Sequence, residues 1–302
     1  MPEVVEIKKF ADFIRRRLLG KPITSIRILK GRYKTHGPFS GYTSLHKKLP
    51  LKIVAVNTKG KFIYITFENG YILLSTMGLF GGYVYKRQDK FVFPNVLDYV
   101  TKDSLKLYRK IALNNLNVEF MSDQGTLYYY DALSFGTLRV LYKRDRVTEL
   151  TKKLNTIGPD IMDENTTSEL FDSRIRRNSN MGKPIGVVLL NQKNISGVGN
   201  YLRADVLWLA KISPFRLVEN ISKSEMRNIF DRLKELTWSS YNYKLGERLG
   251  ILNSQTMIPS KYKRNFFVYN ETKDLYGNDV VKEELYEGSQ KRFIFWAPSV
   301  QK

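Results

Sequence analysis

The spacing of hydrophobic residues changes twice along this chain, and each change predicts a different kind of structure. From residue 3 to residue 19, apolar side chains recur every three or four positions, which is the period of a helix with one buried face. Gly20 and Pro22 follow, and both residue types commonly end helices. The sequence therefore predicts an N-terminal helix over residues 3–19.

Further along, up to about residue 142, the apolar positions alternate with a period of two. The segments are short, rich in β-branched and aromatic residues, and separated by Gly, Asn and Asp turns. Such strands are typical of a β-sandwich or barrel. The predicted strands are residues 53–56, 62–67, 71–75, 83–85, 118–121, 126–130 and 137–142.

After about residue 145 the helical period returns. Thr166 with Glu169, and Ser222 with Glu225, have the spacing of a capping box that starts a helix. Near the end, strand-like segments at 266–269, 280–283 and 292–296 predict a small hairpin module. We therefore predict an α+β protein with three domains: a helix and β-sandwich over 1–145, a helical domain over 146–250, and the hairpin module over 251–302.

The charge of the chain indicates its partner. Its 302 residues suffice for two domains with their own cores, and 50 Lys and Arg against 29 Asp and Glu give a net charge of +21. A surplus of that size repels itself unless a polyanion neutralises it, so nucleic acid is the expected partner. An anionic membrane is the alternative, but no basic amphipathic helix and no membrane-spanning apolar run supports it. We expect a soluble intracellular protein.

The residue types exclude several kinds of site. Cys is absent, which rules out disulfides and thiolate-bound metals. His36 and His46 are the only histidines, and their spacing matches no metal-binding motif, so we expect both on the surface. We expect no metal and no other cofactor.

The first residues offer a nucleophile. Pro2 follows Met1, and a small second residue normally allows removal of the initiator methionine. The freed amine has a reference pKa of about 7.7–8.0, so a sizeable neutral fraction exists at pH 7. Such an amine can form an iminium with a sugar C1′ carbon, and Glu3 beside it can move protons. The alternative is structural, with Pro2 at the first helical position and Glu3 complementing the helix dipole.

A second motif is typical of phosphate binding. In residues 192–208, QKNISGVGNYLRADVLW, Gly197 and Gly199 permit a tight turn. The helix that follows directs free backbone N–H groups and its positive dipole end outward. Asn200 adds an amide donor, and Lys193 adds a positive charge. The sequence predicts a phosphate-binding turn before this helix.

These residues resemble the helix-two-turn-helix motif of the formamidopyrimidine-DNA glycosylase and endonuclease VIII family, and the string GNYLRADVLW is similar to the endonuclease VIII branch. The start of the chain, MPEVVE, is also similar to the start of that family, including the second glutamate, Glu6. The resemblance implies that Pro2 is the nucleophile and Glu3 the acid-base residue.

Two further segments of the first half extend the resemblance. Residues 59–65, KGKFIYI, are similar to a family strand whose lysine enters the active site, which implies that Lys61 binds the phosphate flanking the lesion. Residues 78–81, GLFG, are similar to a family turn that inserts an apolar wedge where the flipped nucleotide was. Leu79 is the first choice for this wedge and Phe80 the second. The alternative is that Leu79 belongs to the core at a strand end.

Two segments depart from the family. Residues 131–136, DALSFG, keep the Asp, Phe and Gly of the family's D-x-R-R-F-G but lack both arginines, one of which pairs with the orphaned base in many members. This implies weak discrimination of the opposite base. At the C-terminus, Ala297 and Val300 occupy the last two cysteine positions of the family's zinc finger, while Arg292 is kept.

That C-terminal segment resembles the zincless finger of family members from animals and large DNA viruses. Without a metal, we expect the hairpin to be held by packing of Phe293, Phe295 and Trp296. The resemblance implies that Arg292 grips phosphates around the lesion, a role that suits its planar guanidinium.

Together the resemblance implies a bifunctional DNA glycosylase and abasic-site lyase of base excision repair. Oxidised bases would be removed through a Pro2 Schiff base followed by β,δ-elimination, with Lys61, Asn200 and Arg292 holding phosphates and Lys193 assisting. The expected partner is damaged DNA, double-stranded or single-stranded, bound by a monomer wherever in the cell that DNA lies. Two alternatives stay open: a DNA-binding protein that kept the fold without the chemistry, and an RNA-binding protein that uses the same turn.

Overall fold

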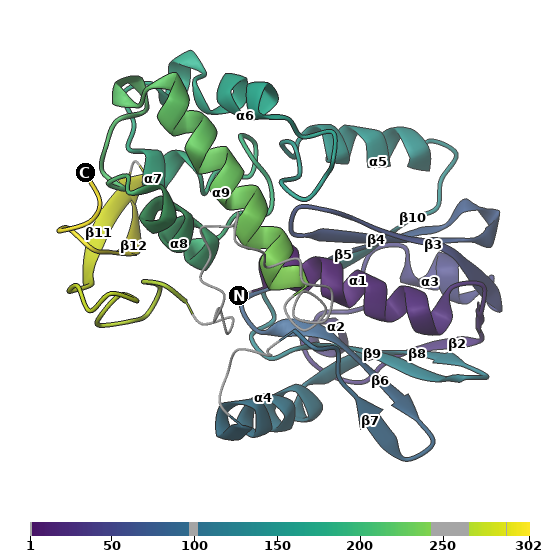
Figure 1. Cartoon of the computed structure of the whole chain (residues 1–302). Helices are drawn as coiled ribbons and strands as arrows, with labels where there is room; N and C mark the ends of the chain where they lie inside the picture. Colours follow the sequence, from purple (N-terminus) through teal and green to yellow (C-terminus); the bar gives the residue numbers. More distant parts are fainter. Residues whose placement is uncertain (1, 97–101, 243–265, 288) are drawn as a thin grey trace. The chain divides into compact units, whose positions relative to one another are not determined.

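The computed structural model describes residues 2–96, 102–242, 266–287 and 289–302. Its internal contacts divide the chain into two compact units, Met1–Asn155 and Thr156–Lys302, called unit 1 and unit 2 below. Figure 1 shows the helices and strands of both. In the described ranges, no helix is long and apolar enough to cross a membrane.

Unit 1 contains two five-stranded antiparallel sheets (Figure 1). The predicted strands each overlap an observed strand, so the two-sheet prediction is confirmed. The first sheet has the order β1 (Pro22–Ile23), β3 (Leu51–Lys59), β4 (Phe62–Phe67), β5 (Ile72–Thr76), β10 (Thr137–Leu141). The second has the order β2 (Ser25–Ile28), β8 (Leu116–Ser122), β9 (Gly125–Asp131), β6 (Gly81–Arg87), β7 (Lys90–Val92).

Helix α1 (Val4–Leu18) packs on β3 and β4 and shares one core with both sheets. Phe10, Phe13 and Ile14 of α1 lie in the same buried cluster as Ile63 and Tyr83. The predicted N-terminal helix is therefore confirmed, with its apolar stripe inward. The other helical segments of unit 1 are α2 (Arg32–Thr35), α3 (Tyr42–His46), α4 (Lys102–Asn114), α5 (Arg146–Asn155) and a 3₁₀ turn (Glu68–Gly70).

Helix α4 was not predicted. Its Leu-Lys-Leu stretch at 105–107 alternates like a strand, and Ala112 is its only fully buried residue, so its helical stripe is weak. His36 and His46 are both exposed, as predicted.

Unit 2 is built around α8 (Asn200–Ala210), in which every residue after Asn200 is buried. Helix α9 (Lys223–Tyr241) packs its predicted apolar stripe on α8 and on α6 (Ser168–Ile175). The remaining elements are α7 (Ile185–Val188), two 3₁₀ turns (Asn178–Asn180 and Val218–Asn220), and the hairpin of β11 (Val281–Glu287) and β12 (Gln290–Trp296). The hairpin is confirmed, but residues 266–269 form no strand, and residues 251–265 lie outside the described ranges.

The two predicted capping boxes had different outcomes. Ser222 caps α9 and exchanges hydrogen bonds with Glu225, as predicted. The other prediction is wrong by one residue, because the cap of α6 is Thr167, whose hydroxyl accepts the backbone N–H of Leu170. The Thr166 hydroxyl instead donates to the Asp160 carbonyl at 2.6 Å, which ties the start of the helix to the preceding loop.

Candidate functional site

The start of α1 holds the residues predicted to be catalytic. Glu3 is the N-cap, and its backbone N–H donates to the Glu6 carboxylate at 2.8 Å, while the Glu3 carboxylate accepts the backbone N–H of Glu6. Both side chains are buried, with 2% and 3% of their surface exposed. Pro2 precedes the cap and is half-buried. The interpretation that Pro2 is the first helical residue is therefore wrong, since the helix begins at Val4.

This reciprocal cap fixes the Glu3 side chain before any substrate is present. A capping pair satisfies two backbone donors that the first helical turn leaves open. The carboxylate of the residue that follows Pro2 in sequence is thereby held in one orientation by the fold itself. An amine adjacent to a buried, oriented carboxyl group can perform nucleophilic attack with proton transfer.

Lys61 lies in the two-residue turn between β3 and β4. Lys59 pairs with Phe62 across this hairpin, so Gly60 and Lys61 form the turn, with Gly60 at φ 55°. Positive φ in such turns matches the twist of the flanking strands. Lys59 donates to the Leu154 carbonyl at 2.8 Å, whereas Lys61 is half-buried at the tip.

The predicted wedge loop joins β5 to β6. Leu79 is 49% exposed, whereas Phe80 is half-buried with its ring 4.7 Å from that of Tyr108 in α4. The two residues therefore have different environments. Leu79 does not belong to the core, which contradicts the alternative interpretation of this residue.

A second loop, residues 132–136, lies against the wedge loop. The backbone N–H of Ala132 donates to the Phe80 carbonyl at 3.0 Å, and a β-carbon at Gly78 would lie 2.6 Å from Cβ of Phe135. This second loop exposes Leu133 (49%) and Phe135 (64%). These two residues were not predicted to be part of the wedge, although Phe135 belongs to the segment similar to D-x-R-R-F-G. The two loops together expose three large apolar side chains, those of Leu79, Leu133 and Phe135.

In unit 2, the predicted phosphate-binding turn is organised by Gln192. Its amide accepts the backbone N–H of Gly197 at 2.9 Å and donates to the Val198 carbonyl at 2.8 Å. Gly197 has φ 99°, a conformation that favours glycine. Gly199 is the N-cap of α8, so Asn200 is the first helical residue, and Lys193 is exposed in the turn.

Arg203 connects this turn to the hairpin and was not predicted. The side chain is fully buried, and it donates to the carbonyls of Gly186 at 3.0 Å and Phe293 at 2.6 Å. It also donates to Oδ1 of Asn200 at 3.4 Å. Because the guanidinium engages the amide oxygen, the NH₂ group of Asn200 remains as a donor for a ligand.

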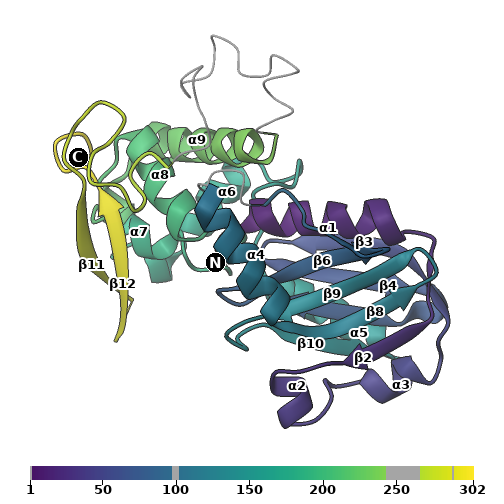
Figure 2. The same cartoon turned by 90° about the horizontal axis from the view of Figure 1, so that it is seen from below.

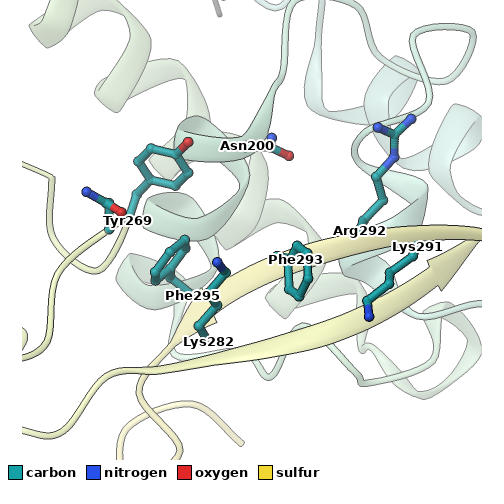
Figure 3. A pocket seen from close by; sticks show the side chains of 8 residues that line it. Asn200, Tyr269, Lys282, Lys291, Arg292, Phe293 and Phe295 are labelled. Atoms are coloured by element: carbon teal, nitrogen blue, oxygen red, sulfur yellow. The ribbon is translucent and has the colours of Figure 1, made fainter.

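Asn200 and Arg292 line one pocket of about 350 Å³ between the start of α8 and β12 (Figure 3). Its other charged walls are Lys282 and Lys291, which sequence analysis missed because they are ordinary strand lysines in the sequence. Lys282 lies 4.5 Å from the centre of the Phe293 ring. Three cations and an amide donor suit a phosphate. Tyr269, Asn270, Phe293 and Phe295 complete the lining.

Buried polar groups attach the segments on either side of the hairpin to the rest of unit 2. The Asp205 carboxylate accepts the backbone N–H groups of Val268 and Tyr269 at 3.0 and 3.1 Å. Gln301 accepts the N–H of Ala297 at 2.8 Å and donates to the Ile212 carbonyl at 2.9 Å. Within the described ranges, no cluster of acidic or histidine side chains could hold a metal ion.

The predicted aromatic packing of the hairpin is only partly correct. Phe295 packs edge-on against Tyr269, and Trp296 against Phe215. Phe293 is 44% exposed, so its predicted role in the attachment is wrong. Side chains alternate along a strand, and Ile294 is the one that turns inward, with 1% exposed.

Comparison with known proteins agrees with both units. The profile of the formamidopyrimidine-DNA glycosylase N-terminal domain matches residues 1–138, and that of the formamidopyrimidine-DNA glycosylase H2TH domain matches residues 157–242. Endonuclease 8 of Shigella flexneri is 26% identical over 243 residues, which cover 80% of each chain. Formamidopyrimidine-DNA glycosylase of Lactococcus lactis subsp. cremoris is 26% identical over 238 residues, covering 78% of this chain and 77% of that protein.

Solved structures share the fold over almost the whole chain. The Lactococcus lactis formamidopyrimidine-DNA glycosylase bound to DNA containing an abasic site matches with a TM-score of 0.74 at 23% identity, covering 99% of both chains. The same enzyme with DNA containing an oxidised pyrimidine matches with a TM-score of 0.74 over 100% of both chains. The predicted α+β fold is therefore confirmed.

Proposed function

Because this chain belongs to the formamidopyrimidine-DNA glycosylase and endonuclease VIII family, we propose that it removes oxidised bases from damaged DNA and then cleaves the abasic strand. Members of this family are DNA glycosylases of base excision repair. The observation that supports the proposal for this chain is the buried, reciprocally capped Glu3, which directly follows Pro2 in the sequence.

The proposed reaction begins at the Pro2 nitrogen. The nitrogen attacks C1′ of the extruded nucleotide, the bond between C1′ and the base breaks, and the base leaves with the proton that the nitrogen gives up. Glu3 gives a proton to the ring oxygen of the sugar as the ring opens, which produces an iminium between Pro2 and C1′. The iminium withdraws electrons from C2′, whose proton is lost as the 3′ phosphate leaves. A second elimination releases the 5′ phosphate, and water then frees the amine.

The phosphate contacts are divided between the two units. In unit 1, Lys61 at the tip of the β3–β4 hairpin is proposed to hold the phosphate flanking the lesion. In unit 2, Asn200 and Arg292 share the pocket of Figure 3, with Lys193 assisting from the preceding turn. Contacts of this kind position the DNA without reading its sequence.

The wedge is assigned to the exposed apolar side chains of the two adjoining loops. Leu79 is its leading residue, and Leu133 and Phe135 share the role because they are at least as exposed as Leu79. Phe80 anchors the loop through its contact with Tyr108. Residues 131–136 contain no arginine to pair with the orphaned base, so tolerance of different opposite bases is expected. Among lesions, we expect oxidised pyrimidines and ring-opened or hydantoin purines.

Borohydride trapping tests the proposal. Borohydride reduces an iminium to a stable amine, so incubation with duplex DNA carrying an oxidised pyrimidine or an abasic site should give a covalent adduct at the N-terminus. The matched control is the same protein with its N-terminal amine acetylated, which should give none. An adduct that survives blocking, or an intact Met1 in the active protein, would contradict the assignment of Pro2.

The same samples separate the alternatives. A protein that binds lesions without chemistry would prefer lesion-bearing duplex over undamaged duplex and yet form no adduct. An RNA-binding protein would show no preference for lesion-bearing DNA at all.

A further inference from the structure

Helix α4 is attached to unit 1 through a small core of its own, separate from the main one. Val84, Ala112 and Tyr130 form this cluster, and Phe80 and Tyr108 pack against it. The hydroxyl groups of Tyr108 and Tyr130 share a hydrogen bond, and burial raises the pKa of Tyr108 to about 12. Tyr108 therefore stays protonated at neutral pH, and it fixes α4 beside the wedge loop.

The opposite face of α4 carries a row of cations. Lys102, Lys106, Arg109 and Lys110 are all exposed, and their spacing of four, seven and eight residues from the first places them on one side of the helix. In the described part of the chain, no carboxylate forms an ion pair with any of the four. We call these four residues the α4 stripe.

Like charges four residues apart destabilise a helix, so the α4 stripe requires an explanation beyond stability. It extends about 12 Å along the helix axis at 1.5 Å per residue. Duplex DNA carries about seven phosphates over the same axial length. A rigid row of cations is therefore matched in scale to a polyanionic backbone.

We propose that the α4 stripe binds DNA phosphates outside the lesion site, next to the wedge loop. This proposal depends on the proposed function in one respect only, namely that the ligand is DNA. Phe80 is the link, because the ring that anchors the wedge loop packs on the helix that carries the stripe. DNA held by α4 would thus be held at a fixed distance from Leu79.

An anionic membrane fits the α4 stripe less well. Helices that lie on membranes present bulky apolar side chains beside their cations. In α4, Leu107 is the only large apolar side chain that is exposed, at 59%, and the aromatic Tyr108 faces inward.

The test compares two triple variants with the same reduction of charge. One is Lys102→Gln/Lys106→Gln/Lys110→Gln, which leaves Arg109 in place because its guanidinium lies over the Phe93 ring at 5.4 Å. The control is Lys47→Gln/Lys48→Gln/Lys52→Gln, at exposed lysines near α3, which lies well apart from α4 within unit 1 in Figures 1 and 2.

The measurement is the affinity for a duplex carrying an uncleavable abasic analogue, taken over a series of salt concentrations. The slope of log affinity against log salt should become shallower in the α4 variant by about 0.9 for each phosphate that the protein no longer neutralises. The control should keep the wild-type slope. Equal slopes in the two triple variants would overturn the proposal.

Two further readouts keep this result distinct from the proposed chemistry. Borohydride trapping at saturating DNA should proceed at the wild-type rate in the α4 variant. If the wild type itself gives no adduct, the proposed function fails while the salt slopes still decide the role of α4. Loss of binding to vesicles containing phosphatidylserine, with an unchanged DNA slope, would overturn the proposal in favour of a membrane. Thermal unfolding of both variants checks that each is folded.

Discussion

The start of α1 and the β11–β12 hairpin both present candidate DNA-binding or catalytic groups, but they are fixed in opposite ways. At α1, Glu3 and Glu6 hold each other across three residues of sequence. At the hairpin, Arg203 reaches Phe293 and Gln301 reaches Ile212, in each case across about ninety positions. The hydrogen bonds at α1 join residues close in sequence, whereas those at the hairpin join residues that only the folded chain brings together.

The residues at the two places differ in their proposed roles in catalysis and in structure. The α1 carboxylates take part in both, since the same Glu3 that caps the helix is the proposed acid. The hairpin contacts only position groups that bind. At α1, a substitution that keeps the cap should therefore lower the reaction rate without affecting the fold. At the hairpin, a substitution should lower stability and DNA affinity together, and the following experiments test that difference.

The largest effect is expected at Glu3. Glu3→Gln keeps an acceptor for the backbone N–H of Glu6 but loses the ability to give a proton, so single-turnover base release should fall about 10²–10⁴-fold. Glu6→Gln is the matched control, because its amide oxygen can still accept the Glu3 N–H. It should lose less than about tenfold in the same assay, by the same reasoning. Comparable losses in both would mean that Glu3 acts through the cap alone.

Arg203 should give the next largest effect, on stability. Arg203→Ala removes a donor from the buried Gly186 carbonyl and from the partly buried Phe293 carbonyl, and a buried acceptor left unsatisfied costs about 1–3 kcal/mol. Denaturant unfolding should show that loss, and affinity for abasic-analogue DNA should fall with it because Asn200 is no longer oriented.

Arg203→Lys provides the specific readout. It retains the charge but not the fork of donors, so it should recover part of the stability while affinity stays low. Full recovery of affinity by lysine would show that orientation of Asn200 is not the role of Arg203.

The same division explains what the sequence could predict. The α1 helix, seven of the ten strands in the two sheets and the Ser222 cap are marked by residues close in sequence, and these were predicted, whereas the short strands β1, β2 and β7 were not. Arg203 looked like one more helix cation in the string GNYLRADVLW, because its partners come from Gly186 and from β12. The roles of Pro2, Lys61 and Arg292 rest on resemblance and stay predictions.

Helix α4 and the second wedge loop were missed for a related reason. The stretch around Leu105 and Leu107 is ambiguous between helix and strand until the small core around Tyr130 is formed. The exposure of Leu133 and Phe135 is likewise invisible in a sequence, since apolar residues are normally predicted to be buried.

In the wedge loop, the exposed Leu79, which is proposed to contact DNA, stands next to Phe80, which anchors the loop. Substitutions there should have smaller effects than those at Glu3 and Arg203. Leu79→Ala should slow base release about tenfold, because unstacking a base costs a few kcal/mol and the wedge offsets part of it. Its thermal stability should not change, since the side chain is half in solvent. Phe80→Ala should show the reverse pattern, with lower stability and a smaller effect on rate. If only Phe80→Ala slowed base release, Phe80 would be the wedge and Leu79 would not.

The smallest effect is expected at the start of α9, where a similar capping box has no proposed catalytic role. Glu225 and Ser222 form a capping box like that of Glu3 and Glu6, and the backbone N–H of Ser222, with Arg216 and the Ser222 hydroxyl adding to it, lowers the pKa of the Glu225 carboxyl. A lowered folded-state pKa means that the contribution is complete above the unfolded value of about 4.3 and disappears as pH falls through the folded value.

Glu225→Gln keeps an amide oxygen for the Ser222 N–H but loses the negative charge at the helix N-terminus, so it should lower the free energy of unfolding by about 0.3–1 kcal/mol at pH 7, a difference that closes in acid, with DNA cleavage unchanged. Urea unfolding at a series of pH values measures it. This variant calibrates the comparison, because it shows what loss of a capping carboxylate does by itself. Suppose that Glu3→Gln raises the activation free energy of base release by no more than Glu225→Gln lowers the free energy of unfolding. The buried Glu3–Glu6 pair would then have only a structural role, and the proposed chemistry would need another acid.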